Sequence, residues 1–192
     1  FPIFPKHFTV PSAEHTYQQM TSERLADMLD LALTYKDYVI FFNGPKCGAS
    51  APDHFHFQLG NKGFLPIEES FDSLKLTEIC RYKGVQICSP DNYINSAVIF
   101  RGTDPDMLVR SIWRVISSLE YDYNLVGWAA GEEIILFYFP RTARRPACFH
   151  ATDDSRIRIS PGCADMAGTF IITSYDEFMK VDDAIIERIV SE

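Results

Sequence analysis

The sequence lacks any apolar run close to the roughly 18 to 20 residues that a membrane-spanning helix needs. The longest such run is the heptapeptide "IILFYFP". Basic residues are also scarce, with 18 lysines and arginines against 26 aspartates and glutamates. The missing apolar run leads us to expect no membrane as partner. Because an acidic surface repels polyanions, we also expect no nucleic acid polymer, although a focused pocket can still hold a small anion.

Cysteine is the next scarce residue, with five copies at wide and irregular spacing and no C-x-x-C pair. An odd number without paired spacing argues against a disulfide framework and against a structural zinc site. We therefore expect no protein-bound metal, a reducing cytoplasmic location, and cysteines that act as small buried hydrophobic residues. These are Cys47, Cys80, Cys88, Cys148 and Cys163.

Hydrophobic residues, in contrast, make up 46% of the 192 positions, which is enough for one sizeable core or two small ones that share an interface. The sequence begins at Phe1 rather than at a methionine, and "FPIF" already resembles a strand. We therefore expect an N-terminally truncated fragment of a soluble globular protein.

The pattern along the chain predicts the same order of elements twice. A strand at 7–10 precedes a helix at 22–35 and a buried strand at 38–42, and "HFHFQ" follows as a further strand. A strand at 96–101 then precedes a helix capped by Asp104, and "YNLVGWAAGEEIILFYFPR" supplies two more strands. The apolar positions expected to bury these helices are Leu25, Met28, Leu29 and Ala32 in the first and Leu108, Ile112, Val115, Ile116 and Leu119 in the second.

This repetition predicts an α+β fold of two related strand-helix-strand-strand units, with a mainly antiparallel sheet and packed helices. Residues 1–65 would form the unit that carries the chemistry, and 66–192 a second, degenerate unit with Phe137, Tyr138 and Phe139 in place of histidines. In the tail we expect strands at 156–160 and 169–173, and a terminal helix that buries Ile185, Ile186, Ile189 and Val190.

The segment "HFHFQ" carries the strongest functional signal. Alternation along a strand would place His54, His56 and Gln58 on one face and the apolar residues between them on the other. Three such polar groups span roughly 13 Å, comparable to a di- or triphosphate with its ribose. The simpler alternative is an amphipathic strand whose polar side faces water.

The preceding loop favours the functional interpretation. Glycine and alanine let the backbone approach a ligand, and successive N–H groups with a serine hydroxyl can hold an anion. An amide and a cation nearby could also contact ribose or phosphate. The candidate substrate-binding residues in this loop are Asn43, Lys46, Gly48, Ala49 and Ser50.

Two alternating histidines also occur in metal sites, but no Asp or His follows at the H-x-H-x-D-H spacing, and only His7, His15 and His150 remain elsewhere. A neutral imidazole, with a reference pKa of about 6.5, can instead attack phosphorus directly. Its second nitrogen must then donate a hydrogen bond to keep the ring oriented.

The stretch "GASAPDHFHFQ" resembles the H-x-H-x-Q motif in the transferase branch of the histidine-triad (HIT-like) superfamily. That branch includes galactose-1-phosphate uridylyltransferase, diadenosine tetraphosphate phosphorylase and plant GDP-galactose phosphorylase, and the sequence most closely resembles uncharacterised bacterial members. "FPIFPKHFTVPSAEHT" and "ISPGCADMAGTFIIT" are more loosely similar to other parts of the group. Asp53, between Pro52 and His54, departs from the pattern, and the C-x-x-C zinc ligands of the family are absent.

The resemblance implies that His56 attacks the α-phosphorus of a nucleoside diphosphate sugar or dinucleoside polyphosphate and forms a nucleotidyl-histidine. It further implies that His54 braces that ring, that Gln58 binds a phosphoryl oxygen and that Ser50 holds the leaving phosphate. A glutamine in the third position goes with transfer to phosphate or a sugar phosphate, whereas a third histidine goes with hydrolysis. No cofactor is required, and a divalent metal bound with the nucleotide is left open.

Outside the motif, Arg141, Arg144 and Arg145 in "PRTARRP" are candidates for the phosphate of the second substrate, or else a solvated turn. Asp165 could reach a sugar hydroxyl or simply occupy a turn. The leading expectation is a nucleotidyltransferase or nucleotide phosphorylase. A nucleotide hydrolase and a non-catalytic nucleotide-binding module remain alternatives, and a homodimer is left open.

Overall fold

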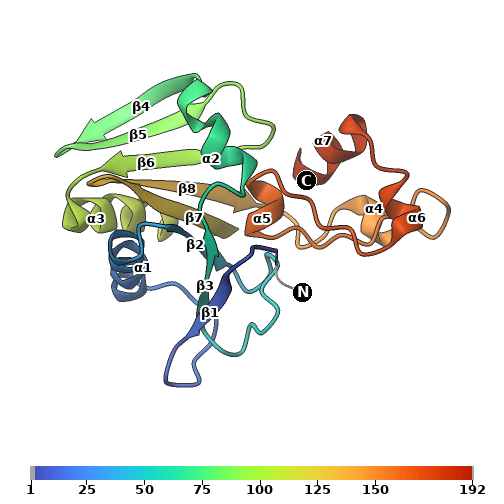
Figure 1. Ribbon diagram of the computed structural model, residues 1–192, viewed down its shortest axis with the longest axis horizontal. Helices are drawn as coiled ribbons and strands as arrows, with labels where there is room; N and C mark the ends of the chain where they lie inside the picture. The colour runs from blue at the N-terminus through green and yellow to red at the C-terminus, as the bar shows by residue number, and fades with distance from the viewer. Residues whose placement is uncertain (1–2, 192) are drawn as a thin grey trace.

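A computed structural model describes residues 3–191 and shows an eight-stranded antiparallel sheet in the order β1-β3-β2-β7-β8-β6-β5-β4 (Figure 1). The predicted α+β class, with a mainly antiparallel sheet and packed helices, is confirmed. The strands are β1 (His7–Pro11), β2 (Tyr38–Asn43), β3 (His56–Asn61), β4 (Leu76–Tyr82), β5 (Val85–Pro90), β6 (Val98–Gly102), β7 (Asp122–Ala130) and β8 (Glu133–Arg141).

Two long helices cover one face of this sheet and contact each other. Both begin where the sequence predicts. The Thr21 hydroxyl caps the first by accepting from the Arg24 N–H at 3.2 Å, and the predicted cap Asp104 accepts from the Met107 N–H at 3.1 Å. The helices are α1 (Ser22–Thr34), α2 (Pro66–Ser70), α3 (Pro105–Ile116), α4 (Ala147–His150), α5 (Cys163–Met166), α6 (Tyr175–Phe178) and α7 (Asp183–Ser191), with a 3₁₀ turn at Phe71–Ser73.

The two halves of the chain use the same strand order. In the first half β3 lies between β1 and β2, and in the second half β8 lies between β6 and β7. The halves join where β2 pairs with β7, with Asn43 opposite Asn124. This topology agrees with two related strand-helix-strand-strand units, whereas a domain boundary after residue 65 stays a prediction.

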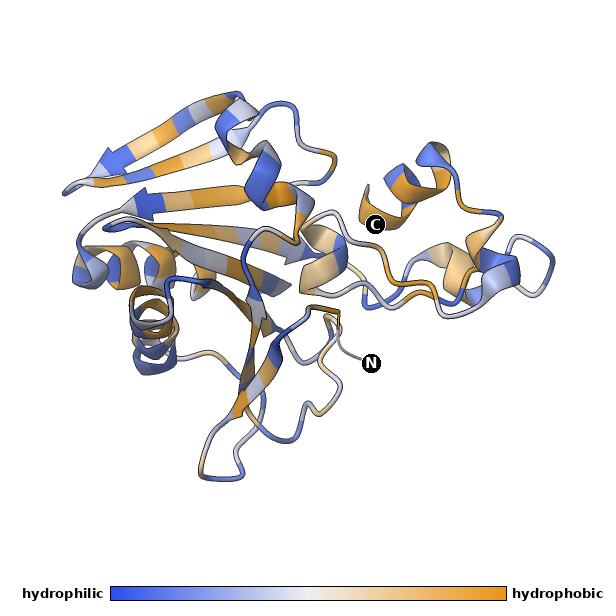
Figure 2. Ribbon diagram, in the orientation of Figure 1, coloured by the Kyte–Doolittle hydropathy of each residue, from blue (hydrophilic) through white to orange (hydrophobic). Residues whose placement is uncertain are grey.

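Hydrophobic residues run along the central strands because these strands are covered on both faces (Figure 2). On the face under α1 and α3, Phe42, Phe57 and Leu125 are buried with the apolar stripes of the two helices. On the opposite face, Phe41 and Phe137 pack with residues of α2 and α5. The sheet is therefore the central layer of the molecule, and each of its two faces packs against a different hydrophobic cluster.

The outer hairpin of β4 and β5 was not predicted. Its sequence gives a weak signal because β4 is an edge strand with mostly exposed side chains and an irregular register between Glu78 and Cys80. Without a buried face, a strand has no need for the apolar alternation on which sequence interpretation relies.

The two strands expected in the tail are wrong, since neither 156–160 nor 169–173 belongs to the sheet. The Ile157 N–H donates to the carbonyl of Cys148 and the Ile171 N–H donates to the carboxylate of Asp165. Ile157 and Ile159 are nevertheless buried, because they form a small core with Ile189 of α7. Apolar side chains in this segment therefore reflect burial without strand pairing.

Smaller expectations also need correction. Leu119 is 39% exposed, because α3 already ends at Ile116. The strand expected in "FPIF" lies partly outside the described residues, and Phe4 is buried beside the sheet without joining it.

Cys47, Cys88 and Cys163 are free thiols and are buried as expected. Cys80, however, is exposed, so the expectation is wrong there. Within residues 3–191, no helix has the length and apolar character that crossing a membrane requires.

Candidate functional site

His56 begins β3 and is buried, with 6% of its surface exposed. Because side chains alternate along the strand, Phe57 and Leu59 enter the core under α1 and α3 while His56 and Gln58 face the opposite side of the sheet. There they border a cavity of about 200 Å³. This His56 cavity is lined by Thr9, Pro11, Ser50, Ala51, His54, His56 and Gln58, so it brings together four of the predicted site residues.

One hydrogen bond determines the protonation pattern of the His56 ring. Nδ1 lies 2.9 Å from the carbonyl oxygen of His54. A carbonyl can only accept, so Nδ1 must carry the hydrogen, and the neutral ring keeps its lone pair on Nε2. Within the described part of the chain Nε2 has no hydrogen-bond partner. The ring is thus held in the form that a nucleophile or a general base requires.

The resemblance implies that the His54 side chain supports the His56 ring, but the structure shows this side chain bonded elsewhere. His54 precedes β3, and its Nε2 donates to the carbonyl of Ser12 at 2.9 Å. Its ring lies 4.7 Å from that of His15, which in turn is 3.3 Å from the carboxylate of Asp53. Support for the His56 ring therefore comes from the main chain of His54, while the His54 ring ties the loop to the segment after β1.

Gln18 was missed in the sequence, although it makes the most extensive contacts with the backbone of His56. This fully buried side chain accepts from the His56 N–H at 2.8 Å and donates to the carbonyls of His56 and Asn43, each at 3.0 Å. Nothing in the stretch "TYQQM" separates Gln18 from Gln19, which is exposed. The amide of Gln18 fixes the start of β3 against the end of β2.

Gln58 is oriented by His7 of β1. The side-chain oxygen of Gln58 lies 2.9 Å from Nε2 of His7, and since an amide oxygen accepts, His7 donates. This leaves the NH₂ group of Gln58 as a donor on the side chain that borders the His56 cavity. A donor beside Nε2 of His56 is suited to a phosphoryl oxygen.

The glycine-bearing loop is shaped mainly by its packing. A Cβ on Gly44 would lie 2.6 Å from the carbonyl oxygen of Tyr123, and one on Gly48 would lie 2.8 Å from Cα of Gly162. Gly48 also has φ +90°, a conformation that favours glycine. Ala49 is buried and Ser50 is exposed at the His56 cavity. The two glycines thus allow the loop to pack closely against the neighbouring backbone, and Ser50 faces the cavity.

Asn43 at the end of β2, Asn124 near the start of β7 and Arg141 at the end of β8 form a largely buried polar network. The Asn43 side-chain oxygen accepts from Asn124 and from the Cys163 N–H, both at 2.8 Å. Arg141 is 6% exposed and donates to Asn124 at 3.0 Å and to the carbonyl of Pro161 at 2.9 Å. The network joins the sheet to α5, so the oxygen of Asn43 and the guanidinium of Arg141 already have partners within the fold.

The remaining candidates lie outside the His56 cavity. Asp165 is 5% exposed, and its two oxygens accept from the N–H groups of Gly162 and Ile171 at 2.8 and 2.9 Å. Arg145 donates to the Ser160 hydroxyl at 2.7 Å. Lys46 borders a different and larger cavity. The structure does not bring these three side chains to His56, and their roles toward a substrate stay predictions.

Burial raises the pKa of Asp165 to about 6, which gives a testable pH dependence. Between its usual value of 3.8 and the folded value, the native state holds a proton that the unfolded state has lost. The free energy of unfolding should therefore fall as the pH rises from 4 to 7, by at most about 3 kcal/mol from this group. We expect urea titrations to show this fall relative to Asp165→Asn, and equal pH dependence in the two proteins would contradict it.

Metal ligands are not clustered in this region. Across residues 3–191, no group of three or more His, Cys, Asp or Glu side chains is arranged so that it could hold a metal ion. Whether a divalent metal accompanies a bound nucleotide stays a prediction.

Comparison with known proteins places this geometry in a structural context. The family model described as a domain of unknown function (DUF4922) matches residues 1–61, and no curated protein matches the chain in sequence. Yeast Ap4A phosphorylase superposes with a TM-score of 0.71 at 15% identity, over 99% of this chain and 68% of that one.

A second solved structure, a DUF4931 family protein from Bacillus cereus ATCC 10987, matches with a TM-score of 0.52 at 19% identity, over 73% of this chain and 78% of that one. At such identities the likeness concerns architecture. The chain therefore has the HIT-like α+β fold seen in yeast Ap4A phosphorylase.

Proposed function

We propose that this chain is a nucleotide-processing enzyme of the HIT-like type in which His56 is the nucleophile. The reaction would be nucleotidyl transfer or phosphorolysis of a nucleoside diphosphate sugar or a dinucleoside polyphosphate. The observation that carries the proposal is the His56 ring, whose Nδ1 donates to the carbonyl of His54 and whose side chain borders a cavity. The fold it shares with a phosphorylase of dinucleoside polyphosphates supports the same class of substrate.

In the first step, the Nε2 lone pair of His56 attacks the α-phosphorus of the substrate. A P–N bond forms as the P–O bond to the leaving group breaks, and the electron pair departs with that oxygen. The leaving group is a sugar phosphate for a nucleoside diphosphate sugar and a nucleoside polyphosphate for a dinucleoside polyphosphate. In the second step, an oxygen of inorganic phosphate or of a sugar phosphate attacks the same phosphorus and the P–N bond breaks. The Nδ1 hydrogen stays on the ring throughout, where the His54 carbonyl stabilises the positive charge of the intermediate.

Two other residues of the His56 cavity bind the phosphate groups of the substrate in this proposal. The NH₂ group of Gln58 donates to a non-bridging oxygen of the α-phosphate, where negative charge develops. The hydroxyl of Ser50 hydrogen-bonds to the leaving phosphate from the loop side. Because Gln58 occupies the third motif position, transfer to a phosphate acceptor is favoured over hydrolysis.

Trapping the covalent intermediate tests the proposal. The protein would be incubated without acceptor with diadenosine tetraphosphate and with a panel of nucleoside diphosphate sugars, quenched in base, and analysed by intact and peptide mass spectrometry. We expect one nucleotidyl group on His56, none in His56→Asn, and an unchanged adduct in His150→Asn, which alters an exposed histidine of α4.

Absence of an adduct and of turnover across the whole panel would refute the proposal. Product analysis with and without added phosphate separates the mechanisms, since a phosphorylase yields product that depends on phosphate. Phosphate-independent release of a nucleoside monophosphate would instead identify a hydrolase.

A further inference from the structure

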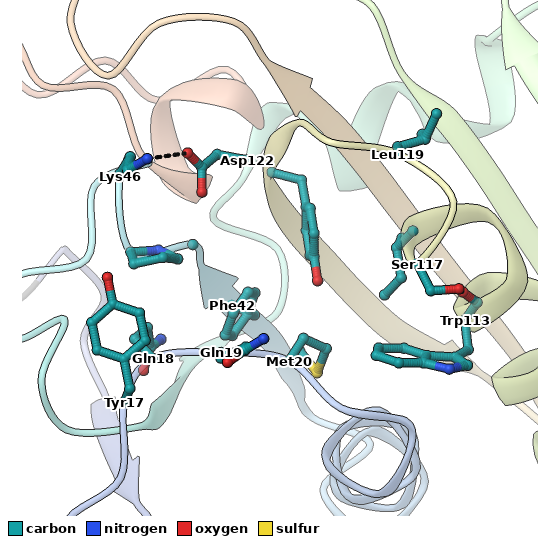
Figure 3. A pocket seen from close by; sticks show the side chains of 14 residues that line it. Tyr17, Gln18, Gln19, Met20, Phe42, Lys46, Trp113, Ser117, Leu119 and Asp122 are labelled. Atoms are coloured by element: carbon teal, nitrogen blue, oxygen red, sulfur yellow. Dashed lines mark hydrogen bonds and ion pairs between the residues drawn. The ribbon is translucent and has the colours of Figure 1, made fainter.

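A second cavity in the described part of the chain, larger than the His56 cavity, lies on the helix-covered side of the sheet. It encloses about 580 Å³ between the segment after β1, the loop after β2 and the end of α3. Figure 3 shows Tyr17 and Trp113 on opposite sides of this cavity with Phe42 between them. Phe42 belongs to the core under α1 and α3, so this cavity, here named the aromatic cavity, lies on the opposite side of the sheet from the His56 side chain. Gln18, which binds the His56 backbone, also borders it.

Four aromatic side chains border the aromatic cavity, but polar groups stand among them without partners. Within residues 3–191, the Tyr123 hydroxyl, the indole N–H of Trp113 and the side-chain amide of Gln19 form no hydrogen bond. A purely hydrocarbon occupant would bury these groups unpaired, at a cost of about 1–3 kcal/mol each. The lining therefore favours a flat aromatic occupant that also offers hydrogen-bond acceptors.

The charge at the rim of the aromatic cavity also bears on which class of ligand it can bind. At the mouth, Lys46 Nζ and Asp122 Oδ2 form an ion pair at 3.9 Å, drawn as the dashed line in Figure 3, so these two side chains together carry no net charge. A neutral rim gives no net attraction for a polyphosphate, in contrast to sites that gather several cations. The volume falls within the range of about 300–1,000 Å³ that small-molecule sites occupy.

We propose that the aromatic cavity is a second ligand site, which binds the heteroaromatic ring of an uncharged nucleoside independently of His56. The ring lies among the aromatic side chains, and one of its nitrogen atoms accepts a hydrogen bond from the Tyr123 hydroxyl. The ribose lies toward Lys46 and Asp122, whose exposed polar atoms bind hydroxyl groups. This site does not depend on the proposed transfer reaction.

Fluorescence offers a direct measurement, because the chain has two tryptophans and they lie on opposite faces of the sheet. Trp128 is 5% exposed and stacks on Phe137, so Trp128→Phe leaves Trp113 as the single reporter at the aromatic cavity. Adenosine and guanosine are the probes. We expect saturable quenching with a sub-millimolar dissociation constant, and the same affinity when His56→Ala is added.

Two variants make the test specific. Ser117→Phe places a large ring in the cavity and should weaken binding at least about tenfold, and Tyr123→Phe removes one hydrogen bond and should weaken it about three- to tenfold. Circular dichroism verifies that each variant is folded, and Tyr123→Phe decides the question if Ser117→Phe does not fold.

Quenching that fails to appear with either nucleoside would overturn the proposal. So would affinity that is unchanged in both folded variants, or binding that disappears in His56→Ala, which would place the nucleoside in the His56 cavity instead. None of these outcomes depends on turnover, so failure here and failure of the transfer reaction are distinguishable.

Discussion

Replacement of His56 by asparagine should lower kcat/KM by about a thousandfold or more, because it removes the atom that we propose forms the bond to phosphorus. An asparagine amide can still donate to the His54 carbonyl, so the loop should keep its shape. Steady-state kinetics on the substrate that gives the adduct, with thermal unfolding of both proteins, would measure the two effects separately. We expect nearly equal stability and a very large difference in rate.

His54→Asn is the matched comparison for His56. The His54 ring donates to Ser12 and so supports the loop, without being placed to attack phosphorus. We therefore expect a loss of activity about one hundred times smaller than for His56→Asn, with the adduct still formed. If the two variants lost activity equally and neither formed an adduct, the assignment of His56 as the single nucleophile would be wrong.

Gln18→Leu should have the second largest effect, and it should act on both stability and rate. The substitution leaves the N–H and carbonyl of His56 and the carbonyl of Asn43 without partners in a buried place. At about 1–3 kcal/mol for each unsatisfied group, we expect the free energy of unfolding to fall by about 3 kcal/mol or more. Urea titration of the purified variant measures this loss.

A kinetic signature separates positioning from general destabilisation. Below its melting temperature, folded Gln18→Leu should show a reduced kcat with little change in KM, since the substrate contacts remain while the His56 ring is less well held. Gln86→Leu is the control, because Gln86 donates to Glu78 on the exposed hairpin, and it should change stability by less than about 0.5 kcal/mol. A normal kcat in Gln18→Leu would rule out a positioning role.

The parts of the fold that sequence predicts well are those with local signals. A capping side chain and an apolar stripe indicate each of helices α1 and α3, and runs of β-branched and aromatic residues indicate the buried strands. The hairpin of β4 and β5 lacks that signal because most of its side chains face solvent. In the tail, Ile157 and Ile159 are apolar for a core made with α7, so their pattern misleads.

The candidate site also contains residues that a local sequence pattern predicts and residues that only long-range contacts define. His54, His56 and Gln58 are neighbours in sequence, so alternation alone suggests a shared cavity. Gln18 acts through contacts 25 and 38 positions away, which no local pattern contains. Conversely, the oxygen of Asn43 binds partners 81 and 120 positions away, so its structural use could not be read from the loop.

The contact between the glycine-bearing loop and α5 has a consequence for synthesis of the protein. Gly48 rests on Gly162, and Asn43 bonds to the Cys163 N–H, 120 positions later. A ribosome translating this message makes the motif early, yet the residues that brace its loop leave the exit tunnel much later. The loop before His56 can therefore reach its final packing only after the segment around Gly162 has been made, and nascent chains stalled before Gly162 should contain the histidines without a fully packed loop.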